Sequence, residues 1–370
     1  MIKILFLIRD LGQGGAEKVL VNLVNNMDSS KFDISVTALF GGGVNEQFLA
    51  PHIHFRAVWK HSVPGNSHLM KLLSPRQLHK LCVKEHYDIE VSYLEGPSAR
   101  VISGCPYKDT KLVSWIHTEF LNEKALTTPF RSKKEALNCY HIFHYTACVS
   151  RNVLNRFREL TEIREHTGVL YNTIESDKIF SLSKEDVPAL SLHSCPRLIA
   201  LGTLKEVKGF DRLLWVIKRL VEDGYALHLY LLGIGPLWDQ LQKEIDNLGL
   251  SHCVTMPGYD VNPYKYIRGC DLFVCSSHAE GFSTAATEAL IVGTPVCTVE
   301  VSGMKEMLGE HNEYGIVTEN NETALYQGIK SLLDDPQLLQ HYTKQAALRG
   351  KAFSTEETVN AVENMLLSLS

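Results

Sequence analysis

Two glutamates eight positions apart, Glu280 and Glu288, follow an apolar run and lead into a helix-forming stretch. Ser283 or Thr284 can cap that helix, which leaves backbone N–H groups at its N-terminus available to an anion. A diphosphate there would meet the positive end of the helix, and the carboxylates could accept hydrogen bonds from sugar hydroxyls. Glutamates at this spacing also occur by chance, so the combination of strand, Gly281 and cap indicates the ligand site.

A pair of lysines follows the first apolar strand of the second half. Lys205 and Lys208 lie between Gly202 and Gly209, directly before a predicted helix. Cationic side chains beside a helix N-terminus suit an anionic ligand, although solvated lysines on a turn are an equally good interpretation. The next strand leads into a turn with two more glycines, at positions 233 and 235, which can bring the backbone close to a ligand.

The first half carries weaker signals of the same kind. Gly14 and Gly15 follow the first strand, but Glu17 stands where a dinucleotide-binding loop would have its third glycine. The second strand also ends without an acidic residue for a ribose, which disfavours a nicotinamide dinucleotide. The glycines either admit a phosphate or sugar or form a tight turn. His117 ends another strand, where an imidazole could bond a substrate hydroxyl, but a single histidine is more often structural.

Short apolar runs alternate with helix-period segments along almost the whole chain, as in parallel sheets covered on both faces. The runs predict buried strands, and between several of them the spacing predicts helices. We therefore expect two doubly wound α/β domains, connected by the polar stretch 175–196. The predicted strands are 2–8, 34–39, 89–93, 112–116, 143–149, 198–201, 226–231, 271–275 and 295–299, and the predicted helices include 16–27, 69–84 and 153–160.

Composition narrows the class of protein. The chain has 370 residues, of which 45% are apolar and 21% charged, and its net charge of −5 argues against nucleic acid as a partner. Nine cysteines without a C-x-x-C pair indicate reduced, structural thiols in a cytosolic protein. No apolar run approaches the roughly 20 residues of a membrane span, and the N-terminus lacks the features of a signal peptide.

Residues 51–84 form a basic stretch without any aspartate or glutamate, in which leucines are interspersed. One interpretation is an amphipathic helix packed on a sheet. The other is a surface that docks on anionic lipid headgroups, at about 1 kcal/mol for each basic residue. The second interpretation predicts a peripheral protein on the inner face of the cell membrane.

Glu280-x7-Glu288, with Ser276 before it and Gly293-Thr294-Pro295-Val296 after it, resembles the retaining GT-B glycosyltransferases of family 4. Gly14 to Glu17, Val149-Ser150, 171–174 and Gly233-x-Gly235-Pro236 follow that family's order over nearly the whole chain. The resemblance implies two facing Rossmann-like domains with a cleft between them: an acceptor-side domain, 1–175, and a donor-binding domain, 176–354. It also implies that a final helix, 355–370, packs back on the first domain.

The resemblance implies a transferase of hexosyl or N-acetylhexosaminyl groups that retains anomeric configuration. Its donor would be a nucleotide-sugar, with UDP favoured over GDP. The acceptor would be a glycan, a lipid-linked sugar or a protein, in cell-surface polysaccharide or glycoconjugate assembly. Because the chain has no Asp-x-Asp, and helix N-termini with Lys208 can stabilise a diphosphate, we expect no essential metal and no other cofactor.

By the same resemblance, Glu288 would hold the donor ribose, Glu280 the sugar ring or its phosphate, and Lys208 the diphosphate, while His117 would contact the donor sugar. The catalytic set is then Glu280, His117 and Lys208. The acceptor side is lined by Gly14, Gly15 and Glu17. The remaining donor-binding residues are Gly202, Thr203, Lys205, Gly233, Gly235, Gly281, Phe282, Ser283 and Thr284.

The chain departs from the family at one position. The family shows Gly-Arg-Leu before its Lys-Gly, whereas Thr203 replaces the arginine here. Lys205 can substitute as a point charge on phosphate. The departure motivates a second hypothesis, a non-catalytic relative that acts as a partner subunit. A third is another enzyme of similar shape, such as a sugar-nucleotide epimerase.

Overall fold

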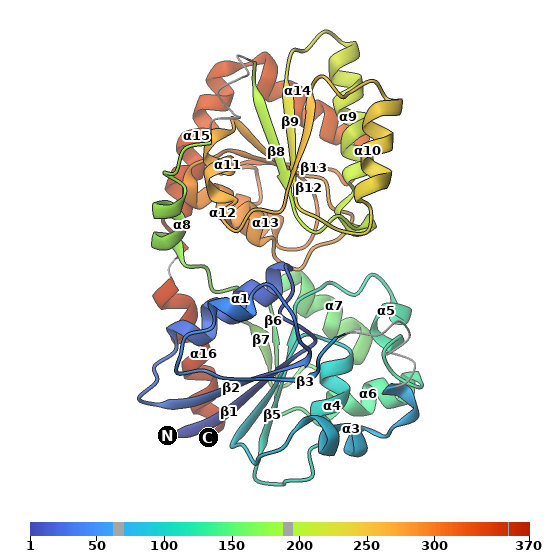
Figure 1. Cartoon of the computed structure of the whole chain (residues 1–370), viewed down its shortest axis with the longest axis vertical. Helices are drawn as coiled ribbons and strands as arrows, with labels where there is room; N and C mark the ends of the chain where they lie inside the picture. Colours follow the sequence, from blue (N-terminus) through green and yellow to red (C-terminus); the bar gives the residue numbers. More distant parts are fainter. Residues whose placement is uncertain (62–69, 188–194, 354) are drawn as a thin grey trace. The chain divides into compact units, whose positions relative to one another are not determined.

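The computed structural model describes residues 1–61, 70–187, 195–353 and 355–370. The chain divides into two units, one formed by Met1–Thr173 with Thr355–Ser370 and the other by Ile174–Ser354 (Figure 1). Each unit has a parallel sheet whose central strands are buried on both faces, which favours apolar runs such as that of Ile2–Ile8.

The first unit has a sheet of seven described strands in the order β3-β2-β1-β4-β5-β6-β7. Helix α1 contacts α16, helix α4 lies between α3 and α6 and contacts both, and α5 contacts α6 (Figure 1). The strands are β1 (Ile2–Ile8), β2 (Phe32–Phe40), β3 (His54–Trp59), β4 (Ile89–Tyr93), β5 (Lys111–Ile116), β6 (Tyr145–Cys148) and β7 (Thr167–Val169). The helices are α1 (Gly15–Asn26), α3 (Pro75–Cys82), α4 (Pro97–Ile102), α5 (Glu123–Thr127), α6 (Lys133–His141), α7 (Arg151–Thr161) and α16 (Thr355–Leu369), with the 3-10 turn η1 (Glu46–Phe48).

The second unit has six described strands in the order β10-β9-β8-β11-β12-β13, all parallel. Helices α9, α10 and α14 pack together, and α8, α11 and α15 each pack against α12 (Figure 1). The strands are β8 (Arg197–Leu201), β9 (His228–Leu232), β10 (Val254–Gly258), β11 (Leu272–Cys275), β12 (Val296–Val299) and β13 (Ile316–Thr318). The helices are α8 (Ser176–Leu182), α9 (Phe210–Glu222), α10 (Trp238–Asn247), α11 (Tyr264–Gly269), α12 (Thr284–Val292), α13 (Met304–Leu308), α14 (Glu322–Asp334) and α15 (Pro336–Gly350), with the 3-10 turn η3 (Glu206–Lys208).

The predicted helix 69–84 is wrong as a single element. Residue 69 lies outside the described residues, residues 70–72 are helical, and α3 begins only at Pro75. The proline forces Ser74 into an extended conformation, and Ser74 then caps α3 through a reciprocal pair of hydrogen bonds with Gln77. The proline and its cap therefore divide the leucine-rich pattern into two pieces.

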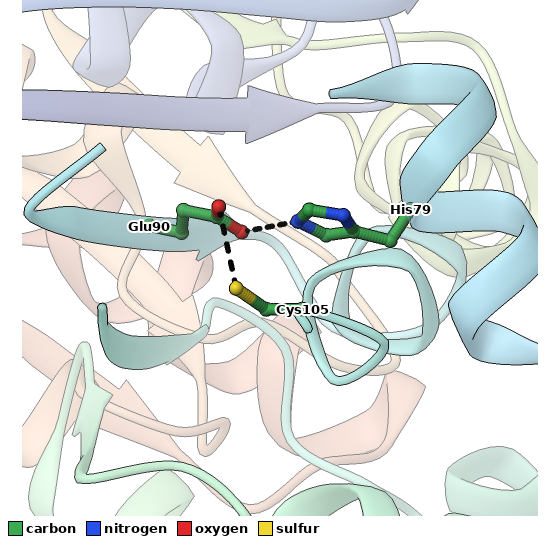
Figure 2. A group of neighbouring side chains, drawn as sticks. All are labelled: His79, Glu90 and Cys105. Carbon is green, nitrogen blue, oxygen red and sulfur yellow. Dashed lines mark hydrogen bonds and ion pairs between the residues drawn. The ribbon is translucent and has the colours of Figure 1, made fainter. Parts of the chain in front are cut away.

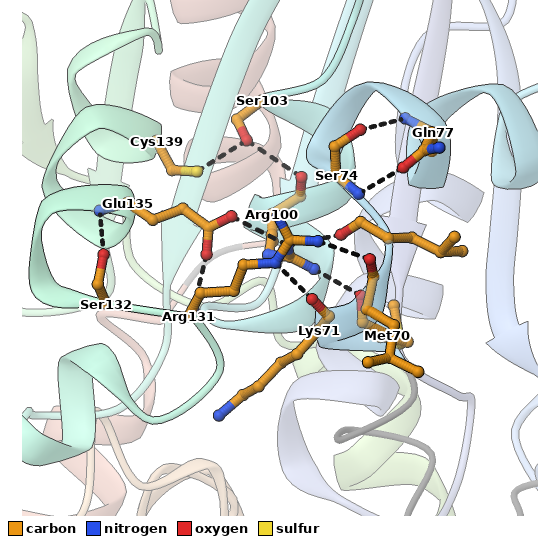
Figure 3. A network of polar contacts seen from close by, with 12 residues as sticks. Met70, Lys71, Ser74, Gln77, Arg100, Ser103, Arg131, Ser132, Glu135 and Cys139 are labelled. Carbon is orange, nitrogen blue, oxygen red and sulfur yellow. Dashed lines mark hydrogen bonds and ion pairs between the residues drawn. The ribbon is translucent and has the colours of Figure 1, made fainter.

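Two arginines hold the segment that precedes α3. The guanidinium of Arg100, only 1% exposed, donates to the carbonyl oxygens of Met70 and Leu73, each at 2.7 Å, and pairs with Glu135 at 2.9 Å. Glu135 in turn accepts a hydrogen bond from the backbone of Arg131, whose side chain donates to the carbonyls of residues 71 and 72 (Figure 3). These contacts fix the backbone of this segment against α4 and α6.

The polar stretch 175–196 is more than a connection. Its first part forms α8, which packs against α11 and α12 of the second unit, so the chain enters that unit at Ile174. Residues 188–194 lie outside the described residues.

The last helix, α16, belongs to the first unit, although residue 354 before it is outside the described residues. Its buried Glu363 accepts a hydrogen bond from the backbone N–H of Asp28 at 2.7 Å and pairs with Lys31 at 3.3 Å. These contacts join the C-terminal helix to the turn after α1. All nine cysteines fall within the described residues and are free thiols, and no described helix combines the length and apolarity that a membrane span requires.

Candidate active site

The order of the strands reverses between β8 and β11 in the second sheet and between β1 and β4 in the first. Where the connections after two adjacent parallel strands run in opposite directions, a crevice opens at the carboxyl ends of those strands. Doubly wound proteins bind their ligands in this crevice. In the second unit, the loops at this point are 202–209 and 276–283. They contain most of the residues that the sequence predicted for the donor.

Lys208 and Glu280 meet at this point. The Lys208 Nζ lies 2.6 Å from Glu280 Oε1, and the hydroxyl of Ser277 donates to the same carboxylate oxygen at 2.6 Å. Although burial opposes the charged ammonium, the Glu280 carboxylate outweighs it and raises the pKa of Lys208 above its usual value. The side chains are 26% and 12% exposed, so a fixed cation and a fixed carboxylate border the solvent together.

The two loops approach each other so closely that glycine is required at position 209. Its φ is +59°, and a Cβ there would lie 2.3 Å from the carbonyl oxygen of Ser276. The Ser276 hydroxyl donates to the Lys208 carbonyl at 3.0 Å, and the His278 N–H donates to Val207 at 2.7 Å. These bonds hold the backbone on both sides of the Lys208–Glu280 pair.

Arg212, on the first turns of α9, is a site residue that the sequence did not reveal. Its guanidinium donates to the carbonyls of Ser276 and Ser277, both at 2.6 Å, and to Asn320 Oδ1 at 2.8 Å. The residue is 5% exposed, and burial lowers the pKa of its guanidinium. No local pattern marks this arginine, because the carbonyls it binds are 64 and 65 residues away in sequence.

The loop after β9 packs against the loop after β8. Gly233 has φ +135°, and a Cβ there would lie 1.9 Å from the Gly202 carbonyl oxygen, while a Cβ at Gly235 would lie 2.6 Å from backbone atoms of Leu204. The glycines therefore have a packing role in addition to any contact with a ligand. Thr203 and the exposed Lys205 lie on the same loop, where the Lys205 N–H donates to the Thr203 carbonyl.

Ser283 is the residue that caps α12, since its hydroxyl accepts the N–H of Ala286 at 3.3 Å. Thr284 is the first residue of the helix. Gly281 and the buried Phe282 precede the cap, and Glu288 is buried on the helix itself, 3% exposed. The structure thus brings Lys208 and Glu280 into contact and places Glu288 on the helix that follows.

In the first unit, His117 follows β5 and lies in an aromatic environment. Its ring centroid is 4.6 Å from that of Tyr93, and the backbone N–H of His117 donates to the Glu95 carboxylate at 2.9 Å. Burial lowers the pKa of His117 to about 3, so the imidazole is neutral at physiological pH. Its Nε2 is buried and has no hydrogen-bond partner among the described residues.

Gly14 precedes α1 as its N-terminal cap, and Glu17 is in the first turn of that helix, with its carboxylate folded back over Gly14. Burial, together with the charge of Glu17, raises the pKa of Tyr93 well above its usual value. Gly14 to Glu17 follow β1 and His117 follows β5, so the residues predicted for the acceptor side and His117 share the carboxyl edge of the first sheet.

The fold and these loops define a class of protein. Two parallel α/β units, each with its reversal point bordered by glycine-containing loops, constitute the GT-B fold of glycosyltransferases. The match to Glycosyltransferase Family 4 covers residues 13–178, and the match to Glycosyl transferases group 1 covers residues 188–349. The chain is a glycosyltransferase built from these two family domains.

Individual glycosyltransferases are also similar to this chain in sequence. The chain is 29% identical to the N-acetylgalactosamine-N,N'-diacetylbacillosaminyl-diphospho-undecaprenol 4-alpha-N-acetylgalactosaminyltransferase of Campylobacter jejuni, over 95% of this chain and 96% of that protein. It is also 29% identical to the lipopolysaccharide core biosynthesis glycosyltransferase LpsD of Rhizobium meliloti, over 54% and 57% of the two chains. The first similarity spans both units.

Solved structures show the same fold at lower identity. HepE of Anabaena, crystallised with UDP and glucose, superposes with a TM-score of 0.79 at 20% identity, and all of both chains is covered. The sucrose-phosphate synthase of Thermosynechococcus elongatus superposes with a TM-score of 0.81 at 16% identity, over 100% of this chain and 99% of that one.

Proposed function

We propose that the chain transfers a sugar from a UDP-sugar to a lipid-linked glycan, with retention of anomeric configuration. The observation that carries the proposal is the Lys208–Glu280 pair at the reversal point of the second sheet, beside the N-terminus of α12. A cation and a helix N-terminus together stabilise the negative charge of a departing diphosphate. Glu280 is close enough to the same point to position the donor sugar.

The names of similar proteins support the proposed UDP-sugar donor and the proposed lipid-linked acceptor. The name of the Campylobacter jejuni enzyme includes an acceptor linked to undecaprenol diphosphate. That enzyme is similar to this chain over nearly its full length. HepE was crystallised with UDP, which supports a uridine nucleotide. We infer a role in the assembly of a cell-surface glycan on a lipid carrier, at the cytoplasmic face of the membrane.

Transfer of N-acetylgalactosamine from its UDP donor to an undecaprenyl-diphosphate-linked glycan tests this function directly. We expect product formation that is unchanged when EDTA replaces added Mg²⁺ or Mn²⁺, because Lys208 and α12 supply the charge that a metal would otherwise supply. A panel of other UDP- and GDP-sugars serves as the control for donor choice. Transfer that stops in EDTA and returns with Mg²⁺ would contradict this account of charge stabilisation.

We also expect the anomeric configuration of the donor sugar to be retained without a covalent glycosyl-enzyme intermediate. We propose front-face attack in which the departing phosphate takes the acceptor proton, so Glu280 positions the sugar and does not attack it. Glu280→Gln should therefore slow transfer and give no glycosyl-enzyme by mass spectrometry. NMR of the wild-type product should show the donor's anomeric configuration, and an inverted product would refute the mechanism.

The basic stretch 51–84, of which residues 62–69 lie outside the described residues, is our proposed contact with the membrane. Arg76, Lys80 and Lys84 are exposed, and Leu72 is 75% exposed on the segment that Arg100 and Arg131 fix. Cationic side chains around an exposed leucine suit a surface of anionic lipid.

Binding to vesicles measures this contact. The wild type should sediment with vesicles that contain phosphatidylglycerol and release as salt rises, since the Debye length is about 8 Å at physiological ionic strength. The triple charge reversal Lys71→Glu, Arg76→Glu and Lys80→Glu should abolish sedimentation and leave the circular dichroism spectrum unchanged. Equal binding to neutral and anionic vesicles would favour the simpler interpretation, a surface that only covers the sheet.

A further inference from the structure

We propose that His79, Glu90 and Cys105 form a binding site for one zinc-like divalent ion in the first unit. Within the ranges that the structure describes, this is the group of histidine, cysteine and acidic side chains whose ligand atoms all lie within 4.8 Å of one another (Figure 2). The group lies on α3, on β4 and in the loop after α4. None of its members is among the residues assigned to sugar transfer.

The three ligand atoms lie within 4.8 Å of one another, and the contacts of His79 and Cys105 with Glu90 are shorter. Nε2 of His79 lies 2.8 Å from Oε2 of Glu90, and Sγ of Cys105 lies 3.5 Å from the other oxygen of that carboxylate (Figure 2). With Zn–N and Zn–O distances of about 2.0 Å and a Zn–S distance of about 2.3 Å, the edges of a tetrahedral site are about 3.3–3.6 Å. Small side-chain movements would accommodate the ion.

The scaffold around the group is rigid. The capping box of Ser74 and Gln77 fixes the start of α3, and β4 is a central strand that pairs with β1 and β5 around Glu90. Gly104, next to Cys105, packs so tightly on α3 that a Cβ there would lie 2.1 Å from the Pro75 carbonyl oxygen. Each ligand is therefore positioned by an element with independent support, as preorganised metal sites require.

The chemistry of the three donors selects the ion. Imidazole nitrogen, carboxylate oxygen and thiolate sulfur together suit zinc, with water in the fourth position, whereas Mg²⁺ and Ca²⁺ prefer oxygen ligands alone. Glu90 is fully buried, and a buried carboxylate requires compensating positive charge. Cys105 is partly exposed, so an ion can reach the group from its side. Binding releases the thiol proton to solvent.

The site is distant from the residues proposed for transfer. Glu90 pairs with Leu112 across the sheet, and His117 lies five residues farther along the same chain, roughly 16 Å at about 3.3 Å for each residue. Glu90 is near the amino end of its strand, whereas His117 follows the carboxyl end of β5. The ion would therefore stabilise the first unit and would not take part in the reaction.

Metal binding is measured on the full chain after stripping with a chelator. We expect one equivalent of Zn²⁺ by titration with inductively coupled plasma analysis, and Co²⁺ should give a near-ultraviolet thiolate charge-transfer band. Cys105→Ser should lose that band and bind more weakly by at least the roughly tenfold that loss of an outer-shell partner costs, because a direct ligand is removed. Cys195→Ser is the matched control, because Cys195 is a partly exposed thiol of the other unit.

His79→Gln provides a second variant in case Cys105→Ser does not fold, and a circular dichroism spectrum checks each protein. The His79→Gln variant should also bind Zn²⁺ more weakly than the wild type and the Cys195→Ser control. A wild-type chain that binds no Zn²⁺ would overturn the proposal, as would equal binding and an equal Co²⁺ spectrum in Cys105→Ser. In either case the group would be a hydrogen-bonded structural cluster.

Discussion

Lys208→Ala should slow sugar transfer by roughly a hundred- to thousandfold, because loss of one preorganised stabiliser of developing charge costs about 2.7–4 kcal/mol. In the structure its ammonium contacts Glu280 at 2.6 Å, and the two loops that carry this pair are joined by the Ser276 hydroxyl and by a backbone hydrogen bond from His278 to Val207. Removal of the ammonium would leave the Glu280 carboxylate facing the diphosphate. The variant should therefore lose affinity for UDP as well as transfer rate.

The measurement is calorimetric titration of UDP and GDP, together with the rate of transfer. Lys205→Ala is the matched control, since Lys205 is an exposed lysine of the same loop, three residues earlier. We expect a smaller loss for this control unless Lys205 substitutes for the arginine that Thr203 replaces. Thr203→Arg should retain or raise UDP affinity, because it restores the cation usual at that position.

The same titration decides between an enzyme and a partner subunit. The threonine at position 203 favours a non-catalytic relative, because the loop after β8 then lacks the arginine that the family has there. A wild type that binds neither nucleotide at millimolar concentration would refute the donor site and support the partner-subunit hypothesis. Nucleotide binding that is unaffected in Lys208→Ala would show that the diphosphate binds elsewhere.

The sequence predicted the central strands well and missed the strands at the edges of the sheets. Ile2–Ile8 and Ile89–Tyr93 have the predicted bounds. The first is an almost unbroken apolar run, as expected of a strand covered on both faces, whereas the second also buries Glu90 and Ser92. The strands missed were β3, β7, β10 and β13, which are the edges of the two sheets. Their residues are mostly partly exposed, so no unbroken apolar run marks them.

In the candidate site, residues beside local sequence signals could be predicted, whereas residues that act through contacts distant in sequence could not. Lys208 and Glu280 could be named from the sequence because each has glycines and a helix start beside it. Arg212 could not be named, because its function depends on carbonyls that only the folded sheet brings to it. The group of His79, Glu90 and Cys105 was missed for that reason too, since its members come from three separate elements without a ligand spacing in sequence.

Arg212→Met should destabilise the second unit and reduce UDP affinity at temperatures where the protein remains folded. The change leaves the buried carbonyls of Ser276 and Ser277 without their donors, at about 1–3 kcal/mol for each, or roughly 2–6 kcal/mol in total. The loop that carries Glu280 would lose the anchor that fixes its backbone. Arg212→Lys should give an intermediate result, because an ammonium cannot reproduce the guanidinium fork that spans both carbonyls.

Lys218→Met is the matched control for this prediction, since Lys218 is on the same helix and pairs with Glu222 near the surface. An exposed pair of this kind contributes about 0–1 kcal/mol, so the control should melt close to the wild type and bind UDP normally. Thermal unfolding and UDP titration are measured on all four proteins. If Arg212→Met melted earlier but bound UDP with unchanged affinity, Arg212 would stabilise the unit without positioning the loop that carries Glu280.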